Sequence, residues 1–372
     1  MKFAIITHVQ HIKSDNQYFG YAPYIREMNI WLKYVDEVII VAPLVDKELN
    51  PIHEKYNHSH VDFRQVQEFD MTSITNVFKT IARLPKIVTQ VYKAMAQADH
   101  IHLRCPGNMG LIGAMVQILF PKKTKTAKYA GNWDPKAKQP FTYKLQRWIL
   151  SNTFLTKNMQ VLVYGDWENQ TKNIKPFFTA TYSESDKKVI QPKIVEECID
   201  FLFVGTLSKG KQPLYTIKLV EKLYQEGKKV RLNLYGDGIL RPTLETYIKE
   251  NNLQDIVLLR GNQSKETVLK AYQTSHFLIL PSKSEGWPKV VAEAMFWGCV
   301  PIVSPVSCVP YMMGNGSRGI ILHEKLDYDV TQIVSILNTQ EAYQEMARNG
   351  QIWSRQFTID KFEAEIKKLL IK

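Results

Sequence analysis

Long apolar runs are missing from this 372-residue chain. No segment approaches the roughly 18 consecutive apolar residues that a membrane-spanning helix needs. Residues 1–7 read as a strand and lead directly into the polar residues His8, Gln10 and His11, so the apolar centre of a secretory signal is missing as well. We therefore expect a cytoplasmic protein.

Cysteine is scarce, and its spacing excludes the common cysteine motifs. The chain has four cysteines, Cys105, Cys198, Cys299 and Cys308, and no two of them form a C-x-x-C pair. This pattern favours packing thiols in a reducing compartment over disulfides or a zinc site. We expect no metal site and no cofactor.

Acidic residues are outnumbered, 36 against 48 basic residues, and residues 1–198 hold 18 of the acidic and 26 of the basic ones. Asp134 is the local counter-charge to a group of seven lysines: Lys122, Lys123, Lys125, Lys128, Lys136, Lys138 and Lys144. Such a patch suits an anionic membrane surface or a phosphate-bearing acceptor, and a solvated lysine-rich surface explains it equally well. Nucleic acid is not an expected partner, because stacking aromatics and nucleic-acid motifs do not accompany the patch.

The chain is too long for one core, and strand-loop-helix units recur along it. Apolar runs predict strands at 3–7, 38–42, 100–103, 125–130, 160–164, 200–205, 230–235, 256–259, 276–280 and 300–303. Helices are expected at 23–34, 73–98 (broken or kinked near Pro85), 141–156, 213–225, 239–251, 266–275, 329–337, 340–355 and 359–372. Polar sequence at 179–198 predicts a connection between an N-terminal domain, 1–185, and a C-terminal domain, 195–356.

One stretch, 282–298, organises the second half of the chain. It lies between two strands and holds a short helix, with Pro288 suited to the first turn and Gly298 to the C-terminal cap. Glu285 therefore follows a strand end beside a helix N-terminus that can hold a phosphate. Glu293 falls off the apolar stripe of the helix and can face a cleft. The plain alternative is a strand-loop-helix unit with two solvated glutamates.

This stretch also carries a sequence motif that an ordinary strand-loop-helix unit does not need. Glu-Gly-Trp-Pro at 285–288, a second glutamate eight positions after the first, and Ala-Met-x-x-Gly-x-x-Pro-Ile-Val at 294–303 resemble the signature of the retaining nucleotide-sugar glycosyltransferase family 4. The resemblance implies an α/β GT-B fold, in which two Rossmann-like domains face across a cleft and the last helix, 357–372, crosses back to the first domain. It also implies that Glu285 contacts the donor sugar and Glu293 the ribose. The sugar and phosphate would meet the backbone of residues Gly286, Trp287, Pro288, Lys289 and Val290. Each of these residues except the proline offers an N–H group.

The loop after the first strand of the second domain carries the expected phosphate clamp. By the resemblance, Gly205 is followed by an arginine and then a lysine, both gripping the diphosphate. Lys211 keeps the lysine position, but Thr206 stands in the arginine position. Lys209 is a candidate replacement, although lysine lacks the forked geometry of arginine. Both lysines can also be ordinary surface residues.

Two further turns end strands of the same domain. Gly236 and Gly238 resemble the family's turn at the nucleotide, and Gly261 with Asn262 stands where relatives hold the base. Arg241 occupies the last glycine position of a dinucleotide fingerprint, which argues against a nicotinamide dehydrogenase. Taken singly, each turn is as well explained by an ordinary loop.

In the first domain the acceptor-side candidates follow predicted strands. Asp134, after Asn132 and Trp133, is a candidate catalytic residue where relatives place a His or Asp near the sugar. A helix cap or a salt bridge explains Asp134 equally well. Arg104 can meet an anionic acceptor or phosphate, and His102 is a similar candidate at the same strand. His8 and His11 can line the acceptor side, with structural roles as the alternative for each histidine.

The sequence thus predicts a glycosyltransferase that moves a sugar from a nucleoside-diphosphate sugar to a hydroxyl acceptor with retention. Glu285, Lys211 and Asp134 are its expected catalytic residues. The basic first domain favours a lipid-linked glycan acceptor in polysaccharide or glycolipid assembly, and a peripheral position on the inner face of the membrane. The alternatives are a GT-B nucleotide-sugar epimerase and a non-catalytic glycan- or nucleotide-binding module.

Overall fold

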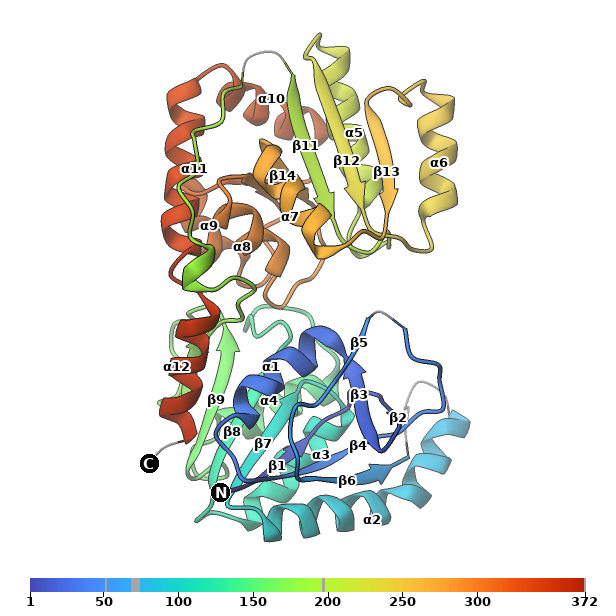
Figure 1. The fold of residues 1–372 in the computed structure, drawn as a ribbon, viewed down its shortest axis with the longest axis vertical. Coiled ribbons are helices and arrows are strands. Elements are labelled where there is room, and N and C mark those ends of the chain that lie inside the picture. Colours follow the sequence, from blue (N-terminus) through green and yellow to red (C-terminus); the bar gives the residue numbers. More distant parts are fainter. Residues whose placement is uncertain (51, 68–73, 196–197, 371–372) are drawn as a thin grey trace. The chain divides into compact units, whose positions relative to one another are not determined.

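The computed structural model describes residues 1–50, 52–67, 74–195 and 198–370, with the side chains of 74–82 excepted. The chain divides into two compact units (Figure 1). Unit 1 comprises Met1–Phe178 and Phe362–Lys372, and unit 2 comprises Thr179–Lys361. Unit 2 thus begins before the limit of 185 expected for the first domain. Residues 196–197 of the expected connection, residue 73 of one expected helix and residues 371–372 of the last helix lie outside the described residues.

Unit 1 is built on a seven-stranded parallel sheet in the order β10-β9-β8-β7-β1-β4-β6. Apolar side chains fill most of its central strands, as is usual for a parallel sheet covered on both faces. The strands are β1 (Lys2–Ile6), β4 (Glu37–Pro43), β6 (Val61–Val66), β7 (His100–Cys105), β8 (Thr124–Tyr129), β9 (Met159–Tyr164) and β10 (Ile174–Phe177).

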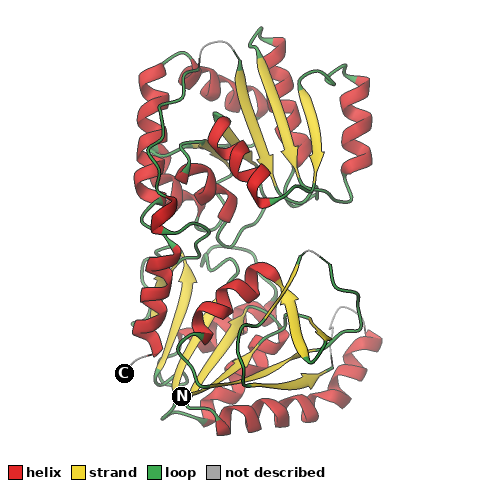
Figure 2. Ribbon diagram, in the orientation of Figure 1, coloured by secondary structure: helices red, strands yellow, loops and turns green. Residues whose placement is uncertain are grey.

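Helices cover both faces of this sheet (Figures 1 and 2). Alternate residues of β1 pack toward the two layers. Ala4 and Ile6 belong to the core shared with α2 (Ile74–Gln97), α3 (Asn108–Val116) and α4 (Phe141–Ser151). Phe3 stacks on Trp31 of α1 (Ala22–Leu32), which covers the other face. Helix α12 (Ile359–Leu370) brings Phe362 against Phe177 and Phe178.

Unit 1 contains strands that were not predicted. The region 8–20, between the expected strand 3–7 and the expected helix 23–34, forms the hairpin β2 (His11–Ser14) and β3 (Gln17–Tyr21), which β5 (His53–Lys55) joins. Asp15 and Asn16 both have positive φ, as a tight hairpin turn of this kind requires. Of the two alternatives expected at Pro85, a break is excluded, because helix α2 continues through this residue.

Three lysines of the expected basic patch have their own partners within unit 1, and two of them are buried, which corrects the prediction that Asp134 is their counter-charge. Lys128 is fully buried and pairs with Glu27 of α1 at 2.9 Å. Lys125 is buried and donates to the carbonyls of Gln117 and Phe120; burial lowers the pKa of Lys125 to about 8. Lys123 donates to backbone carbonyls at 95–98, at the C-terminal end of α2.

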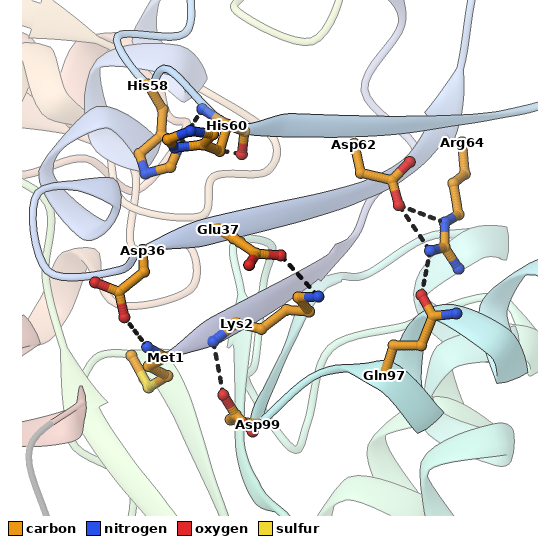
Figure 3. Close-up of polar contacts among 10 residues, drawn as sticks. All are labelled: Met1, Lys2, Asp36, Glu37, His58, His60, Asp62, Arg64, Gln97 and Asp99. Atoms are coloured by element: carbon orange, nitrogen blue, oxygen red, sulfur yellow. Dashed lines mark hydrogen bonds and ion pairs between the residues drawn. The ribbon is translucent and has the colours of Figure 1, made fainter.

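The amino edge of the unit 1 sheet carries exposed polar contacts (Figure 3). Lys2 pairs with Glu37 at 2.7 Å, and Arg64 pairs with Asp62 at 2.7 Å. Surface pairs of this kind contribute only about 0–1 kcal/mol each.

Unit 2 contains a six-stranded parallel sheet in the order β13-β12-β11-β14-β15-β16. Numbered along the chain this is 3-2-1-4-5-6, the order of a dinucleotide-binding doubly wound sheet. The strands are β11 (Ile199–Val204), β12 (Val230–Tyr235), β13 (Val257–Gly261), β14 (Phe277–Leu280), β15 (Val300–Val303) and β16 (Ile320–Ile321). The helices are α5 (Pro213–Gln225), α6 (Arg241–Glu250), α7 (Lys265–Thr274), α8 (Lys289–Phe296), α9 (Val309–Met313), α10 (Leu326–Leu337) and α11 (Gln340–Ser354).

Within the described ranges, no helix combines the length and the apolar character needed to cross a bilayer. Cys105, Cys299 and Cys308 are buried, as expected for packing thiols, whereas Cys198 is exposed.

Candidate functional site

The strand order of unit 2 reverses between β11 and β14, where a doubly wound sheet leaves a crevice at the carboxyl ends of its strands. The loops that follow these two neighbouring strands are tied together. The backbone N–H of Lys283 donates to the Gly210 carbonyl at 2.9 Å. The side chain of Gln212 donates to the Pro281 carbonyl at 2.6 Å. These two bonds hold the loop after β11 next to the loop after β14.

The structure brings Lys211 and Glu285 together at this switch point. Lys211 Nζ lies 2.5 Å from Glu285 Oε1. The glutamate side chain is 9% exposed and the lysine side chain 29%. A cation and a carboxylate, 74 positions apart in the sequence, thus share a partly buried site. Because the medium is less polar than water, each ionic contact made by a ligand there is strengthened.

A buried thiol fixes the backbone beside Glu285. Cys308 Sγ donates to the Gly286 carbonyl at 2.9 Å. Burial, with a smaller contribution from Glu285, raises the pKa of Cys308 to about 12, so the sulfur keeps its proton. The thiol therefore acts as a donor that holds the loop.

Trp287 anchors the same loop from its other side. Its ring is 7% exposed, stacks on Trp353 and meets Phe357 edge-on. Its side chain is thus occupied by packing, which leaves its backbone for any ligand. Pro288 is the N-cap residue of α8, one position before the expected first turn. Gly298 has φ +65 just after the C-cap Trp297, which confirms the predicted stop.

Glycines let the neighbouring strand ends approach closely. A Cβ on Gly236 would stand 2.0 Å from the Gly205 carbonyl oxygen, and one on Gly238 would stand 2.6 Å from the Leu207 carbonyl oxygen. The Gly236 N–H donates to the Gly261 carbonyl at 2.8 Å. These turns form one backbone-lined rim along the ends of β11, β12 and β13.

The remaining expected contacts near this rim differ in exposure. Thr206, Lys209 and Asn262 are exposed, and Lys289 and Val290 lie half-buried in the first turn of α8. Lys209 is therefore placed on the loop where a replacement charge is needed, but it is less enclosed than Lys211.

Glu293 is held by hydroxyl groups in the structure. Tyr272 Oη donates to one carboxylate oxygen at 2.9 Å, and Thr181 Oγ1 donates to the other at 2.7 Å. Burial, followed by the Glu293 charge, raises the pKa of Tyr272 well above its ordinary value, so its hydroxyl stays a donor. Each carboxylate oxygen still has a second lone pair for a ligand.

Unit 1 has a separate hollow at the carboxyl ends of β1, β4 and β7. This cavity of about 230 Å³ is lined by His8, Pro43, Pro106, Gly107, Asn108, Met109 and Tyr143. His8 reaches solvent through this hollow, and the protein that surrounds the rest of its ring, followed by the nearby Arg104 charge, lowers its pKa. The imidazole is therefore neutral near pH 7 and can accept or donate a proton.

Three other candidates in unit 1 make local contacts. Arg104 stacks over Tyr24 and lies 3.4 Å from Glu27. Asn132 Oδ1 accepts from the Asp134 N–H, and Asp134 Oδ1 accepts from the Lys136 N–H, each at 2.8 Å. Asp134 thus stabilises its own turn, and these contacts resemble the local structural role that was the alternative to a catalytic one.

Three acceptor-side candidates are buried, and their prediction as acceptor contacts is corrected. His11 lies in β2 and bonds Tyr56 at 2.9 Å; burial lowers the pKa of His11 to about 4. His102 lies in β7 next to Trp31, and burial lowers its pKa to about 3. Trp133 is 0% exposed and donates to Gln170. Each faces a core, because the strand and turn around it point its ring inward.

The supporting roles of three residues were not predicted from the sequence. Tyr272 and Thr181 hold Glu293 from 21 and 112 positions away in the chain, and Cys308 holds the carbonyl of Gly286 from 22 positions away. Local spacing carries no signal for such pairs. Within the described part of the chain, no three His, Cys, Asp or Glu side chains gather in a group suited to a metal ion.

Comparisons with known proteins agree with this geometry. Residues 184–353 match the family model "Glycosyl transferases group 1". The chain is 28% identical over 137 residues to an uncharacterized glycosyltransferase of Methanocaldococcus jannaschii, covering 37% of this chain and 39% of that protein. It is 27% identical over 150 residues to alpha-D-kanosaminyltransferase of Streptomyces kanamyceticus, covering 40% and 39%. The chain thus spans less than half the length of these curated relatives.

Solved structures match along the whole chain. Sucrose-phosphate synthase from Thermosynechococcus elongatus is similar with a TM-score of 0.66 and 19% identity, covering 99% of this chain and 98% of that one. Anabaena HepE in complex with UDP is similar with a TM-score of 0.70 and 14% identity, again covering 99% and 98%. The chain therefore has the GT-B fold, and its segment 184–353 is related to the group 1 glycosyl transferases.

Proposed function

We propose that this protein is a retaining glycosyltransferase that transfers a sugar, of the hexose class, from a nucleoside diphosphate to a hydroxyl acceptor. The observation that carries the proposal is the Lys211–Glu285 pair at the switch point of the unit 2 sheet. A diphosphate donor needs a cation for its phosphates and an acceptor group for its sugar hydroxyls, and this pair supplies both.

The donor is proposed to lie along the rim formed by Gly205, Gly236 and Gly261. Its diphosphate would meet Lys211 and the N-termini of α5 and α8, whose free N–H groups favour anions. Its sugar would face Glu285, and its ribose would face Glu293. Lys209 would add charge where Thr206 replaces the usual arginine.

In this arrangement Glu285 is a positioning and charge-stabilising residue. As the bond from the anomeric carbon to the phosphate breaks, positive charge develops on the sugar ring and negative charge on the leaving phosphate. Glu285 faces the first and Lys211 the second. The leaving phosphate then takes the acceptor proton on the same face of the sugar, and the configuration is retained. No metal is assigned to this step, so transfer should persist in EDTA.

The acceptor is proposed to enter the hollow around His8 in unit 1, with Arg104 and Asp134 as further candidates. A lipid-linked glycan, as used in cell-surface polysaccharide assembly, is the acceptor class we favour. One relative supports this choice: the GDP-mannose:cellobiosyl-diphosphopolyprenol alpha-mannosyltransferase of Xanthomonas oryzae pv. oryzae, 25% identical over 138 residues.

A panel of nucleotide sugars, scored by thermal shift, tests the donor. A ligand at 100 times its Kd stabilises the folded state by about 2.7 kcal/mol. For a unit of this size that corresponds to about 5–10 °C. UDP-glucose and GDP-mannose come first, because UDP-glucose is bound in an Anabaena HepE structure and GDP-mannose is named for the Xanthomonas relative. A panel of UDP-, GDP-, ADP- and dTDP-sugars that gives no shift would refute the assignment.

Glu285→Gln then separates transfer from binding. We expect it to abolish donor hydrolysis and transfer without weakening nucleotide binding by more than about threefold, since the glutamate faces the sugar and not the phosphates. Loss of both activities together with nucleotide binding would contradict this role. A donor sugar that isomerises without acceptor would identify an epimerase, and binding without turnover would identify a non-catalytic module.

A further inference from the structure

Large aromatic side chains stand out from the surface of unit 1 around α4. Phe141 is 77% exposed, Trp148 60% and Phe154 74%. Of the seven tryptophans, all of which lie in described ranges, Trp148 alone is exposed. Rings of this size are normally buried, so three in one stretch of 14 residues call for a partner.

Helical geometry places two of these rings on one side. Phe141 and Trp148 are seven positions apart in α4, with Lys144 between them, and all three fall within one side of the helix. The opposite side is buried through Gln146, Ile149 and Leu150. α4 is therefore anchored to the unit 1 core by one face and presents the other to its surroundings.

Helix α3 extends the exposed apolar surface. It packs beside α4, because the Gln146 side chain donates to Gly107 and a Cβ on Gly110 would meet Gln146 at 2.7 Å. Further along, Gln117 donates to the Leu155 carbonyl, next to Phe154. On the α3 side, Met115 is 53% exposed and Leu119 is 66% exposed.

The charge around these rings is of one sign. Lys136, Lys138, Lys144 and Lys157 are exposed, and Lys157 Nζ lies 5.1 Å from the centre of the Phe154 ring. Residues 100–165 contain a single acidic residue, Asp134. The exposed lysines near α4 therefore remain largely uncompensated by their own segment, unlike the buried Lys128.

We propose that the α4 face, defined as Phe141, Trp148 and Phe154 with Lys138, Lys144 and Lys157, docks unit 1 on an anionic phospholipid bilayer. Aromatic rings settle at the depth of the lipid headgroups, while lysines are attracted to anionic lipid. This combination fits a lipid surface better than a second protein, because interfaces between proteins are depleted in lysine.

The first turn of α4 also borders the proposed acceptor site, through a residue on another side of the helix from the α4 face. Tyr143, two residues after Phe141, lines the hollow that holds His8. An acceptor whose lipid stays in the bilayer would reach this hollow from the same surface. This last step rests on the proposed function, whereas docking itself needs neither donor nor acceptor.

Vesicle flotation of the full chain tests the docking surface. We expect binding to vesicles of phosphatidylcholine with 30% phosphatidylglycerol and at least tenfold weaker binding to phosphatidylcholine alone. Phe141→Ser with Trp148→Ser, and separately Lys138→Glu with Lys144→Glu, should each weaken binding at least tenfold. The matched controls lie in unit 2: Tyr224→Ser, which removes a 51% exposed ring, and Lys249→Glu with Lys270→Glu should bind as the wild type does.

Tryptophan fluorescence reports insertion directly. Lipid with brominated acyl chains should quench the wild type, and Trp148→Phe should lose most of that quenching while still floating with vesicles. Unchanged melting temperatures of the variants establish that they fold.

The proposal is overturned if Phe141→Ser with Trp148→Ser floats like the wild type. It is also overturned if light scattering shows a wild-type dimer that this variant makes monomeric, since a second copy would then cover the face. Failure of flotation alongside a positive nucleotide thermal shift would remove the docking surface and leave the donor assignment intact.

Discussion

Replacing Lys128 by Met should strongly destabilise unit 1. Lys128 is fully buried, and its partner Glu27 has a side chain only 6% exposed. Removing one partner of a buried ion pair costs about 3–5 kcal/mol, because the other charge is left in a poorly polar medium. We expect the lower part of this range, since Arg104 stays 3.4 Å from Glu27. The melting temperature of unit 1 should fall by about 6–15 °C.

The size of this effect depends on the surroundings of the ammonium group. Lys128 donates to the Phe178 carbonyl at 3.3 Å and lies 4.8 Å from the ring centre of Phe362 in α12. Met keeps most of the volume and can contact the same rings through its sulfur, at about 0.3–1.5 kcal/mol. Packing is thus largely preserved, and the loss of stability reports the removal of the charge.

Two companion variants make the result decisive. Glu27→Met combined with Lys128→Met should recover at least half of the loss, because an apolar pair in place of a buried ion pair is often neutral or stabilising. Lys2→Met breaks the exposed pair with Glu37 (Figure 3) and should cost no more than about 1 kcal/mol. Urea unfolding followed by hydrogen exchange of β8 amides reports unit 1 alone. A loss below about 1 kcal/mol for Lys128→Met would refute the reasoning, as would a double variant less stable than either single one.

Three further predictions concern the site and the pH response. Lys211→Ala should raise the Kd of the nucleotide-sugar donor about 10–100-fold in calorimetry, since a charge-assisted bond contributes about 1.5–3 kcal/mol, whereas the exposed Lys283→Ala should change it less than twofold. Gly236→Ala places a methyl group 2.0 Å from the Gly205 oxygen at φ +129 and should weaken donor binding at least tenfold, while Gly210→Ala, whose Cβ meets only Ser208 Oγ at 3.9 Å, should not. Folded His11, with a pKa of about 4, binds its proton less readily than the unfolded chain near 6.5, so stability should fall by about 3 kcal/mol as pH drops from 6.5 to 4. His11→Gln should flatten that part of the urea-midpoint profile; an unchanged slope would contradict the assignment.

The second half of the chain could be predicted well because its strands are continuous apolar runs, separated by residues that favour turns and helix ends. The bounds of α5, β12 and β15 match the sequence prediction at both ends. Pro213 and Gln225 delimit α5 without any need for tertiary information. The short helix in the glutamate stretch was also predictable, to within one residue at its start, because Pro288 and Gly298 mark its two ends.

The first half was harder for physical reasons. The strand β6 alternates apolar and polar residues, and the hairpin β2–β3 is short, so neither gives a continuous apolar signal. Lys125 and Lys128 flank Thr126 and Ala127 in β8, and lysines in a strand suggest an exposed position unless their buried partners are known. Those partners, Glu27 and the carbonyls after α3, lie elsewhere in the sequence.

The pairing of Lys211 with Glu285 bears on how the site would handle its donor. With Thr206 in the arginine position, Lys211 is the enclosed cation of the β11 loop, and in this structure Glu285 already neutralises it. A diphosphate must therefore compete with a carboxylate for the same ammonium group. The exchange is favourable only if the released Glu285 gains bonds of similar strength, and the hydroxyls of the donor sugar provide them. A free nucleoside diphosphate offers no such bonds. The pair would thus discriminate the intact donor from the spent nucleotide, which would favour release of the product.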